Sequence, residues 1–249
     1  MGITNIEWCH YTFNPWAGCV EVSPACDNCF AKADTKRYGF CEWGKDVPRR
    51  VTSLKYWEQL SKWNRDAQRE GARKRVFVGS WCDLMEDRPE LQMIREQLCG
   101  LIEENLCLDF LLVTKRPQNF RRFLPAAWLD SPRPNVWGMT TVENADYKWR
   151  EKALLDTPFA VRGLSMEPLL GPVEIDPRID WVITGGESGP RARPSDPDWF
   201  RSLRDQCATA GVSFFFKQHG EYRDFVKLGK KAAGALLDGR EWREVPNAA

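Results

Sequence analysis

The sequence predicts an α/β fold, namely a partial (β/α) barrel of about six or seven parallel strands. Short apolar runs rich in β-branched or aromatic residues alternate with segments of helical spacing, which is typical of a parallel sheet. A polar residue follows almost every run. The strands of a (β/α) barrel direct all their carboxyl ends at one pocket, whereas a doubly wound sheet binds its ligand near one switch point. The even spread of polar residues therefore favours the barrel.

The predicted elements follow in chain order. An extended piece at 11–17 leads into a cysteine loop at 13–30, and an irregular stretch at 47–51 precedes a basic helix at 54–69. Residues with helical spacing then predict two further helices, one around 91–102 and one around 197–207 that begins with a proline. Six apolar runs predict buried strands: Val76–Trp81, Asp109–Thr114, Asn135–Thr140, Phe159–Ser165, Trp181–Thr184 and Val212–Phe216.

Length and composition indicate a single domain spanning residues 1–249, with residues 225–249 forming a peripheral hairpin or cap. No stretch reaches the roughly 18 to 20 apolar residues of a membrane span, and the N-terminus lacks the pattern of a signal peptide, so we expect a cytoplasmic protein without a membrane partner. Lys and Arg total 36 against 35 for Asp and Glu, which excludes a global field that attracts nucleic acid. Two histidines leave little material for a hydrolase.

Three of the nine cysteines form a cluster with the spacing C-x6-C-x2-C, namely Cys19, Cys26 and Cys29. Thiols in a reducing compartment are more often metal ligands than disulfides, and soft sulfur ligands suit an iron–sulfur cluster or zinc. Three ligands leave one iron of a four-iron cluster free to bind a cofactor. A structural zinc site completed by His10 or Cys9 remains an alternative, as do core cysteines that bind no metal.

The cysteine loop and several other motifs together resemble a family of phage and bacterial proteins that has a three-cysteine motif and is similar to radical S-adenosylmethionine (radical SAM) enzymes. The resemblance covers nearly the whole chain. Its motifs are Asn14–Cys19, Ser23–Cys29, Thr114–Pro117, Val142–Asn144, Ser165–Gly171, Gly185–Gly189 and Phe215–Gln218.

This resemblance implies a radical SAM-like partial barrel and two cofactors, a 4Fe-4S cluster and S-adenosyl-L-methionine. The three cysteines would hold the cluster, whose fourth iron would chelate S-adenosylmethionine, and an electron donor would be a partner. Reductive cleavage would then give a 5′-deoxyadenosyl radical that abstracts hydrogen from a substrate. The sequence departs from most radical SAM enzymes in the first cysteine gap, which is six residues instead of three, and in the late position of Gly185–Glu187.

Candidate cofactor-binding residues lie at the predicted strand ends. A guanidinium or ammonium there would fix a carboxylate or phosphate, a carboxylate would hold an ammonium or ribose, and glycines would allow close approach of a ligand. Each also has a structural alternative, such as a surface ion pair, an internal salt bridge or a tight turn. The candidates are Lys115, Arg116, Glu143, Glu167, Gly185, Gly186, Glu187 and Ser188, with Ser80, Asp83, Lys217 and Gln218 as further residues of the pocket.

The substrate is inferred from a basic segment, residues 32–50, that contains Tyr38, Phe40 and Trp43. Basic residues bind nucleic-acid phosphates while aromatic rings stack on bases, although acids in the same segment also fit an ordinary solvated face. With the phage setting implied by the resemblance, this favours a nucleobase or nucleotide substrate, as in modification of phage DNA. The alternatives are a zinc-stabilised nucleic-acid-binding module without catalysis and a scaffold that binds a partner protein.

Overall fold

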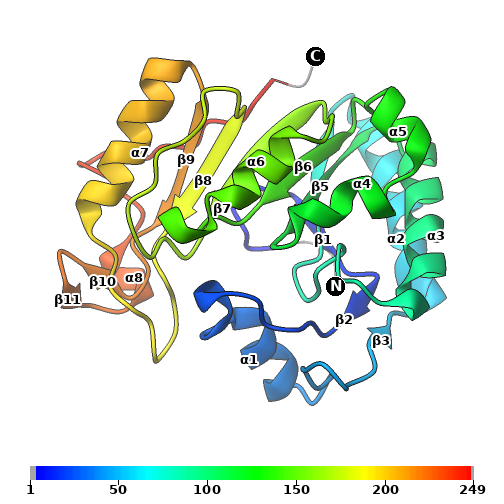
Figure 1. Cartoon of the computed structure of the whole chain (residues 1–249), viewed down its shortest axis with the longest axis horizontal. Coiled ribbons are helices and arrows are strands. Elements are labelled where there is room, and N and C mark those ends of the chain that lie inside the picture. Colours follow the sequence, from blue (N-terminus) through cyan, green and yellow to red (C-terminus); the bar gives the residue numbers. More distant parts are fainter. Residues whose placement is uncertain (1–3, 248–249) are drawn as a thin grey trace.

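A computed structural model of the chain describes residues 4–247 and contains a seven-stranded parallel sheet (Figure 1). The strands lie side by side in the order in which they occur along the chain, so every crossover moves in one direction across the sheet. The sheet is therefore a partial barrel with open edges, as the sequence predicts. Its strands are β1 (Tyr11–Phe13), β4 (Lys74–Val78), β5 (Leu108–Thr114), β6 (Val136–Thr140), β7 (Val161–Met166), β8 (Trp181–Gly185) and β9 (Ser213–Gln218).

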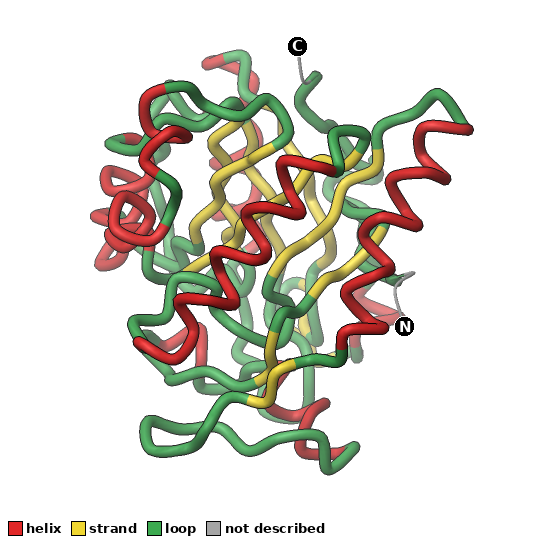
Figure 2. Tube along the Cα trace, turned by 90° about the vertical axis from the view of Figure 1, so that its right-hand side faces the viewer, coloured by secondary structure: helices red, strands yellow, loops and turns green. Residues whose placement is uncertain are grey.

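Helices cover the outer face of the sheet. Figure 2, seen from the side of α2 and α3, shows long helices in front of the strands. The helix predicted at 54–69 is confirmed as α2, because Trp57, Leu60, Trp63 and Ala67 recur every three or four residues and are buried. The helices are α1 (Phe30–Arg37), α2 (Leu54–Arg69), α3 (Gln92–Glu104), α4 (Phe120–Phe123), α5 (Ala126–Asp130), α6 (Trp149–Leu155), α7 (Pro197–Ala210) and α8 (Lys230–Ala233).

Both faces of the sheet are apolar. Val182 in the middle of β8 belongs to the large core shared with the helices, whereas its neighbours Trp181 and Ile183 belong to a second core on the concave face. Trp8, which precedes β1, packs into this second core. Side chains of successive strand residues point to opposite faces, so a strand buried on both faces reads as a continuous apolar run. None of the helices among residues 4–247 is long and apolar enough to cross a lipid bilayer.

Short strand pairs lie at the carboxyl ends of the sheet strands. Strands β2 (Trp16–Ala17) and β3 (Arg50–Val51) pair with each other, and so do β10 (Tyr222–Arg223) and β11 (Val226–Lys227). In Figure 1 both pairs lie with α1 and α8 on one side of the sheet, below it in that view. The hairpin of β10 and β11 ends at Lys227, near the start of the segment 225–249 that the sequence predicts as a hairpin or cap. The chain then returns to the sheet, where the Phe216 amide donates to the carbonyl of Trp242 on the outer edge of β9.

Candidate functional site

A cavity of about 880 Å³ lies at the carboxyl ends of the strands, and we call it the main cavity. Each of the seven strands ends in, or is followed by, at least one residue that lines this cavity. Polar side chains from positions between 14 and 218 thus surround one space. (β/α) Barrels hold their ligands in this geometry. These residues are Asn14 after β1, Ser80 after β4, Lys115 after β5, Thr141 after β6, Glu167 after β7, Glu187 and Ser188 after β8, and Lys217 and Gln218 at the end of β9.

The cysteine loop lies against the end of β4. The amide of Gly18 donates to the carbonyl of Trp81 at 3.0 Å, and Gly18 has φ +103°, which favours glycine. Cys19, Cys26 and Cys29 are free thiols that all line a second, smaller cavity of about 110 Å³. Cys29 lines the main cavity as well. The cysteine loop therefore places three thiols beside the space into which the strand ends project.

The proposed fourth zinc ligands lie elsewhere. Cys9 packs in the concave core, and the ring Nδ1 of His10 accepts a hydrogen bond from the Arg75 amide at 2.9 Å, so neither residue lines the small cavity. Within residues 4–247, no three Cys, His, Asp or Glu side chains are gathered tightly enough to ligate one metal ion. A cluster of several irons differs in this respect, because each thiolate binds a separate iron.

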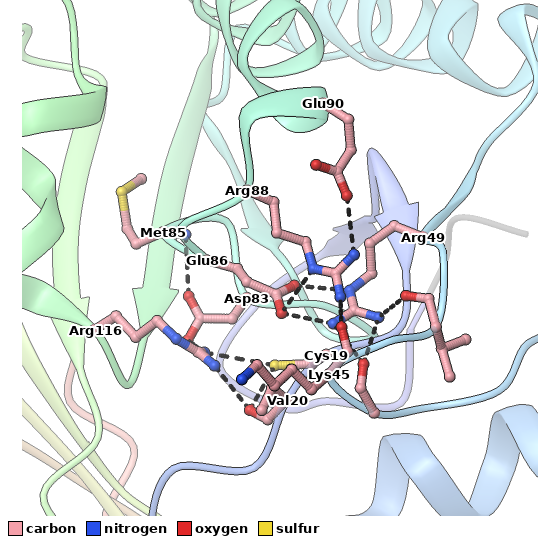
Figure 3. Close-up of polar contacts among 12 residues, drawn as sticks. Cys19, Val20, Lys45, Arg49, Asp83, Met85, Glu86, Arg88, Glu90 and Arg116 are labelled. Carbon is pink, nitrogen blue, oxygen red and sulfur yellow. Dashed lines mark hydrogen bonds and ion pairs between the residues drawn. The ribbon is translucent and has the colours of Figure 1, made fainter.

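Arg116 connects the cysteine loop to the sheet (Figure 3). Its Nη1 lies 3.6 Å from the sulfur of Cys19 and 2.7 Å from the Asp83 carboxylate, and its Nη2 donates to the carbonyl of Val20 at 2.8 Å. Asp83 in turn accepts hydrogen bonds from the hydroxyl of Thr114 and the amide of Lys115. Arg116 lines the small cavity and not the main one, so it contacts a cysteine instead of a ligand there.

The electrostatic setting of Cys19 follows from these contacts. Burial and, to a smaller extent, the nearby Asp83 carboxylate raise the pKa of the Cys19 thiol to about 12, against the opposing effect of the Arg116 guanidinium. The pKa of Arg116 is itself raised by Asp83 and Cys19 against the effect of burial. Arg116 is therefore charged, and it favours the thiolate form that metal binding requires.

A second buried ion pair fixes the loop that follows α1. Arg49 binds the Glu86 carboxylate through two nitrogens at 2.6 and 2.8 Å, and it also donates to the carbonyls of Gly44 and Val47 (Figure 3). Both charged groups are buried. This pair could not be predicted, since no local pattern distinguishes Arg49 or Glu86 from surface residues.

Glu187, which follows β8, connects the cysteine loop to the segment after that strand. Its carboxylate accepts hydrogen bonds from Arg193 at 2.5 Å and from the Asn28 side chain at 3.0 Å, and Arg193 also reaches Asp27 and the carbonyl of Pro24. Burial acts to raise the pKa of Glu187, but the hydrogen bonds from Arg193 and Asn28 outweigh it and lower that pKa. Arg193 was not among the predicted residues.

The remaining predicted residues fall into two groups. Lys115, Glu167 and Ser188 line the main cavity, where Glu167 pairs with Lys217 at 2.7 Å and Ser188 accepts a hydrogen bond from Gln218 at 2.9 Å. Glu143 is fully buried, pairs with Arg150 at 2.8 Å and lines neither cavity.

The two glycines at the end of β8, Gly185 and Gly186, also differ from expectation. Gly185 lies outside the lining of both cavities, whereas Gly186 lines the main cavity. A Cβ on Gly186 would lie 2.0 Å from the carbonyl oxygen of His219, so the close approach is to the backbone after β9 instead of to a ligand. The glycine at this position is explained by packing of the chain against itself.

Comparison with known proteins gives three findings. The sequence profile of a family described as "Protein of unknown function (DUF5131)" matches residues 3–246. No curated protein matches the sequence. Among solved structures, a mutant spore photoproduct lyase with bound AdoMet and dinucleoside spore photoproduct is similar, with a TM-score of 0.49 and 13% identity, and the match covers 85% of this chain. The chain spans 57% of the length of that lyase.

Proposed function

We propose that this chain, which belongs to the DUF5131 family of proteins of unknown function, is an enzyme that uses S-adenosylmethionine and a 4Fe-4S cluster held by Cys19, Cys26 and Cys29. The observation that carries the proposal is that the three thiols of one loop line a small cavity that shares Cys29 and Lys115 with the main cavity. Ligands of a cluster would thus lie next to the space for its cofactor and substrate.

The residues present fit such a cluster. Thiolates are the usual ligands of iron–sulfur clusters, and three of them leave one iron available to a cofactor. Arg116, at 3.6 Å from the sulfur of Cys19, offsets part of the negative charge that three thiolates bring together. When bound, the cluster supplies the electron that cleaves S-adenosylmethionine to methionine and a 5′-deoxyadenosyl radical, the chemistry that belongs to the cofactor.

The chain itself would bind and orient the reactants. Glu167 and Ser188 present a carboxylate and a hydroxyl to the main cavity, the groups that bind an ammonium and ribose hydroxyls. Lys217 holds Glu167 in place, and Gln218 does the same for Ser188. The cysteine loop lines one side of this space through Ala25, Asn28 and Cys29.

The test is an anaerobic determination of iron and sulfide in reconstituted protein. We expect a brown protein with about four irons per chain in the wild type, and loss of both colour and iron in a Cys19→Ala, Cys26→Ala, Cys29→Ala variant. A Cys41→Ala, Cys107→Ala variant, which changes two other half-buried thiols, should keep the cluster. With dithionite as reductant, the wild type should release 5′-deoxyadenosine from S-adenosylmethionine.

A colourless protein that carries one zinc and no iron after reconstitution would contradict the proposal. That result would instead support the zinc-stabilised module, since zinc sites are colourless and lack redox chemistry.

A further inference from the structure

One wall of the main cavity is a stack of three side chains that belong to neither hydrophobic core. The guanidinium carbon of Arg50 lies 4.1 Å from the ring centroid of Phe40, and that ring lies 5.4 Å from the ring of Trp81 at an angle of 55°. All three residues line the main cavity. We call Arg50, Phe40 and Trp81 the stacking wall.

The stacking wall differs from the other aromatic groups of the protein. Trp16, Trp137 and Trp181 are fully buried in the two cores, whereas Phe40 and Trp81 are only half-buried and belong to neither core. Burial of an aromatic ring contributes a large hydrophobic stabilisation, so rings left partly open in a concave site are available to a ligand.

The cavity lining also carries an excess of positive charge. Glu167 is neutralised by Lys217 and Glu187 by Arg193. Of the other charged residues that line the main cavity, and counting partners within residues 4–247, Arg50, Lys115 and Lys230 have no ion pair, and Asp34 is the single acid without one. The net charge of the whole chain is +1, so this excess is local. An anionic ligand is therefore favoured at this site.

We propose that the stacking wall is the substrate subsite and that it binds a nucleobase carrying a 5′-phosphate. The base would stack on Phe40 and Trp81, and the phosphate would lie near Arg50, the combination by which proteins bind single-stranded nucleic acid. An acidic peptide would satisfy the cations but leave the aromatic wall uncovered. This inference deepens the proposed function, because the nucleotide would share the main cavity with S-adenosylmethionine.

The main cavity offers separate walls to the cofactor and to the nucleotide. Its volume of about 880 Å³ lies near the upper end of the range of roughly 300–1,000 Å³ that is usual for one small-molecule site. The cofactor groups of the proposed function come from the ends of β7 to β9, whereas Arg50 comes from β3 and Trp81 follows β4. The two sets of residues thus lie on different walls of one space.

The test is calorimetric titration with each of the four deoxynucleoside 5′-monophosphates, the four nucleosides and inorganic phosphate. We expect at least one monophosphate to bind about ten times more tightly than its nucleoside and than phosphate alone. Arg50→Ala and Phe40→Leu should each weaken this binding about tenfold, in line with the usual contribution of stacking to nucleotide binding. The matched control is the pair Arg37→Ala and Tyr38→Leu, which lies outside the main cavity and should leave the affinity unchanged.

A ten-nucleotide single strand titrated in parallel identifies the source of the ligand. Tight binding of the monophosphate indicates a free nucleotide, whereas tight binding of the strand alone indicates nucleic acid, and either result supports the subsite if Arg50→Ala weakens it. Absence of binding in both arms, or binding that Arg50→Ala and Phe40→Leu leave unchanged, overturns the subsite. All titrations are repeated on the cysteine triple variant, so that failure of the cluster and failure of the nucleotide subsite are told apart.

Discussion

Arg116 is the residue on which the position of Cys19 depends. One guanidinium group contacts a sulfur, a carbonyl of the cysteine loop and the Asp83 carboxylate, and the planar fork of arginine allows all three contacts at once. Lysine has one charged nitrogen and would satisfy fewer of them. Arg116 is thus a positioning residue for the candidate metal ligand.

Replacing Arg116 should therefore affect both stability and cluster loading. Arg116→Ala leaves the buried Asp83 carboxylate without its partner, so we expect the free energy of unfolding to fall by about 3 kcal/mol in a urea titration. The iron content after reconstitution should fall as well. Arg122→Ala, which removes an exposed pair with Asp87, should change stability by less than about 1 kcal/mol. Equal effects of the two substitutions would contradict the role of Arg116.

The two histidines predict a loss of stability in mild acid. Burial lowers the pKa of both His10 and His219 below 6.5, and His10 accepts a hydrogen bond at Nδ1 that a protonated ring cannot accept. As pH falls below about 6.5 the unfolded chain binds protons that the folded chain does not, so stability decreases through this window and is full above it.

Urea titrations between pH 5 and 7.5 check this prediction. The denaturation midpoint should fall on the acidic side in the wild type. In a His10→Asn, His219→Gln variant it should fall less, because the amides keep the hydrogen bonds to Arg75 and Leu236 without titrating. An unchanged slope in this variant would show that the loss comes from other groups.

At the scale of elements, the chain after β8 packs directly against the backbone at the end of β9. The register shifts between Thr184 and Gly185, and the amide of Gly186 donates to the carbonyl of Gln218 at 2.9 Å. A Cβ on Gly186 would meet backbone atoms and not a flexible side chain, so the backbone itself would have to move to make room.

A pair of glycine substitutions tests this close packing. We expect Gly186→Ala to lower the free energy of unfolding by about 3 kcal/mol, the upper part of the range for overpacking. Gly100→Ala in α3, where an added Cβ meets nothing within 4 Å, should stabilise the protein by about 1 kcal/mol, the difference in helix propensity. Thermal and urea unfolding measure both effects, and a neutral Gly186→Ala would contradict the packing argument.

The elements were predictable because their signals are local. The apolar runs predicted six strands of the sheet within a few residues, and the basic helix predicted at 54–69 is α2. The site was predictable only in part. Lys115, Glu167 and Ser188 follow strands and line the main cavity, but Glu143 also follows a strand and pairs with Arg150 inside the core.

Contacts distant in sequence explain what the patterns missed. Arg49 reaches Glu86 across 37 residues and Arg193 reaches Asp27 across 166 residues. A charged residue in a loop has the same appearance in the sequence whether it ends in solvent or in such a pair. Whether such a residue is solvated or paired depends on the tertiary arrangement of the segments around β1, β4 and β8.

At the scale of the whole molecule, an open barrel has two exposed edges, and the C-terminal segment covers one of them. The amide of Phe216 donates to the carbonyl of Trp242, the amide of Glu244 donates to that of Phe214, and the Trp181 indole donates to the carbonyl of Glu244. An uncovered edge strand is a template for pairing with another chain.

Truncation tests this role of the C-terminal segment. A chain that ends at Asp238 leaves the edge of β9 unpaired, so we expect self-association and a lower melting temperature. A chain that ends at Val245 retains the edge contacts and serves as the control. Light scattering after gel filtration measures the association, and a monomeric, equally stable truncated chain would contradict the prediction.

The contacts of Asn28 with Glu187 and of Asp27 with Arg193 also have a consequence for biosynthesis. Asn28 precedes Glu187 by 159 residues, so at about 5 to 20 residues per second the cysteine loop leaves the ribosome roughly 8 to 30 seconds before its partners are made. During that time the nascent chain carries the three thiols but still lacks Glu187 and Arg193, which contact the cysteine loop in the folded protein. In that interval the thiols are more accessible to oxidation than in the folded protein.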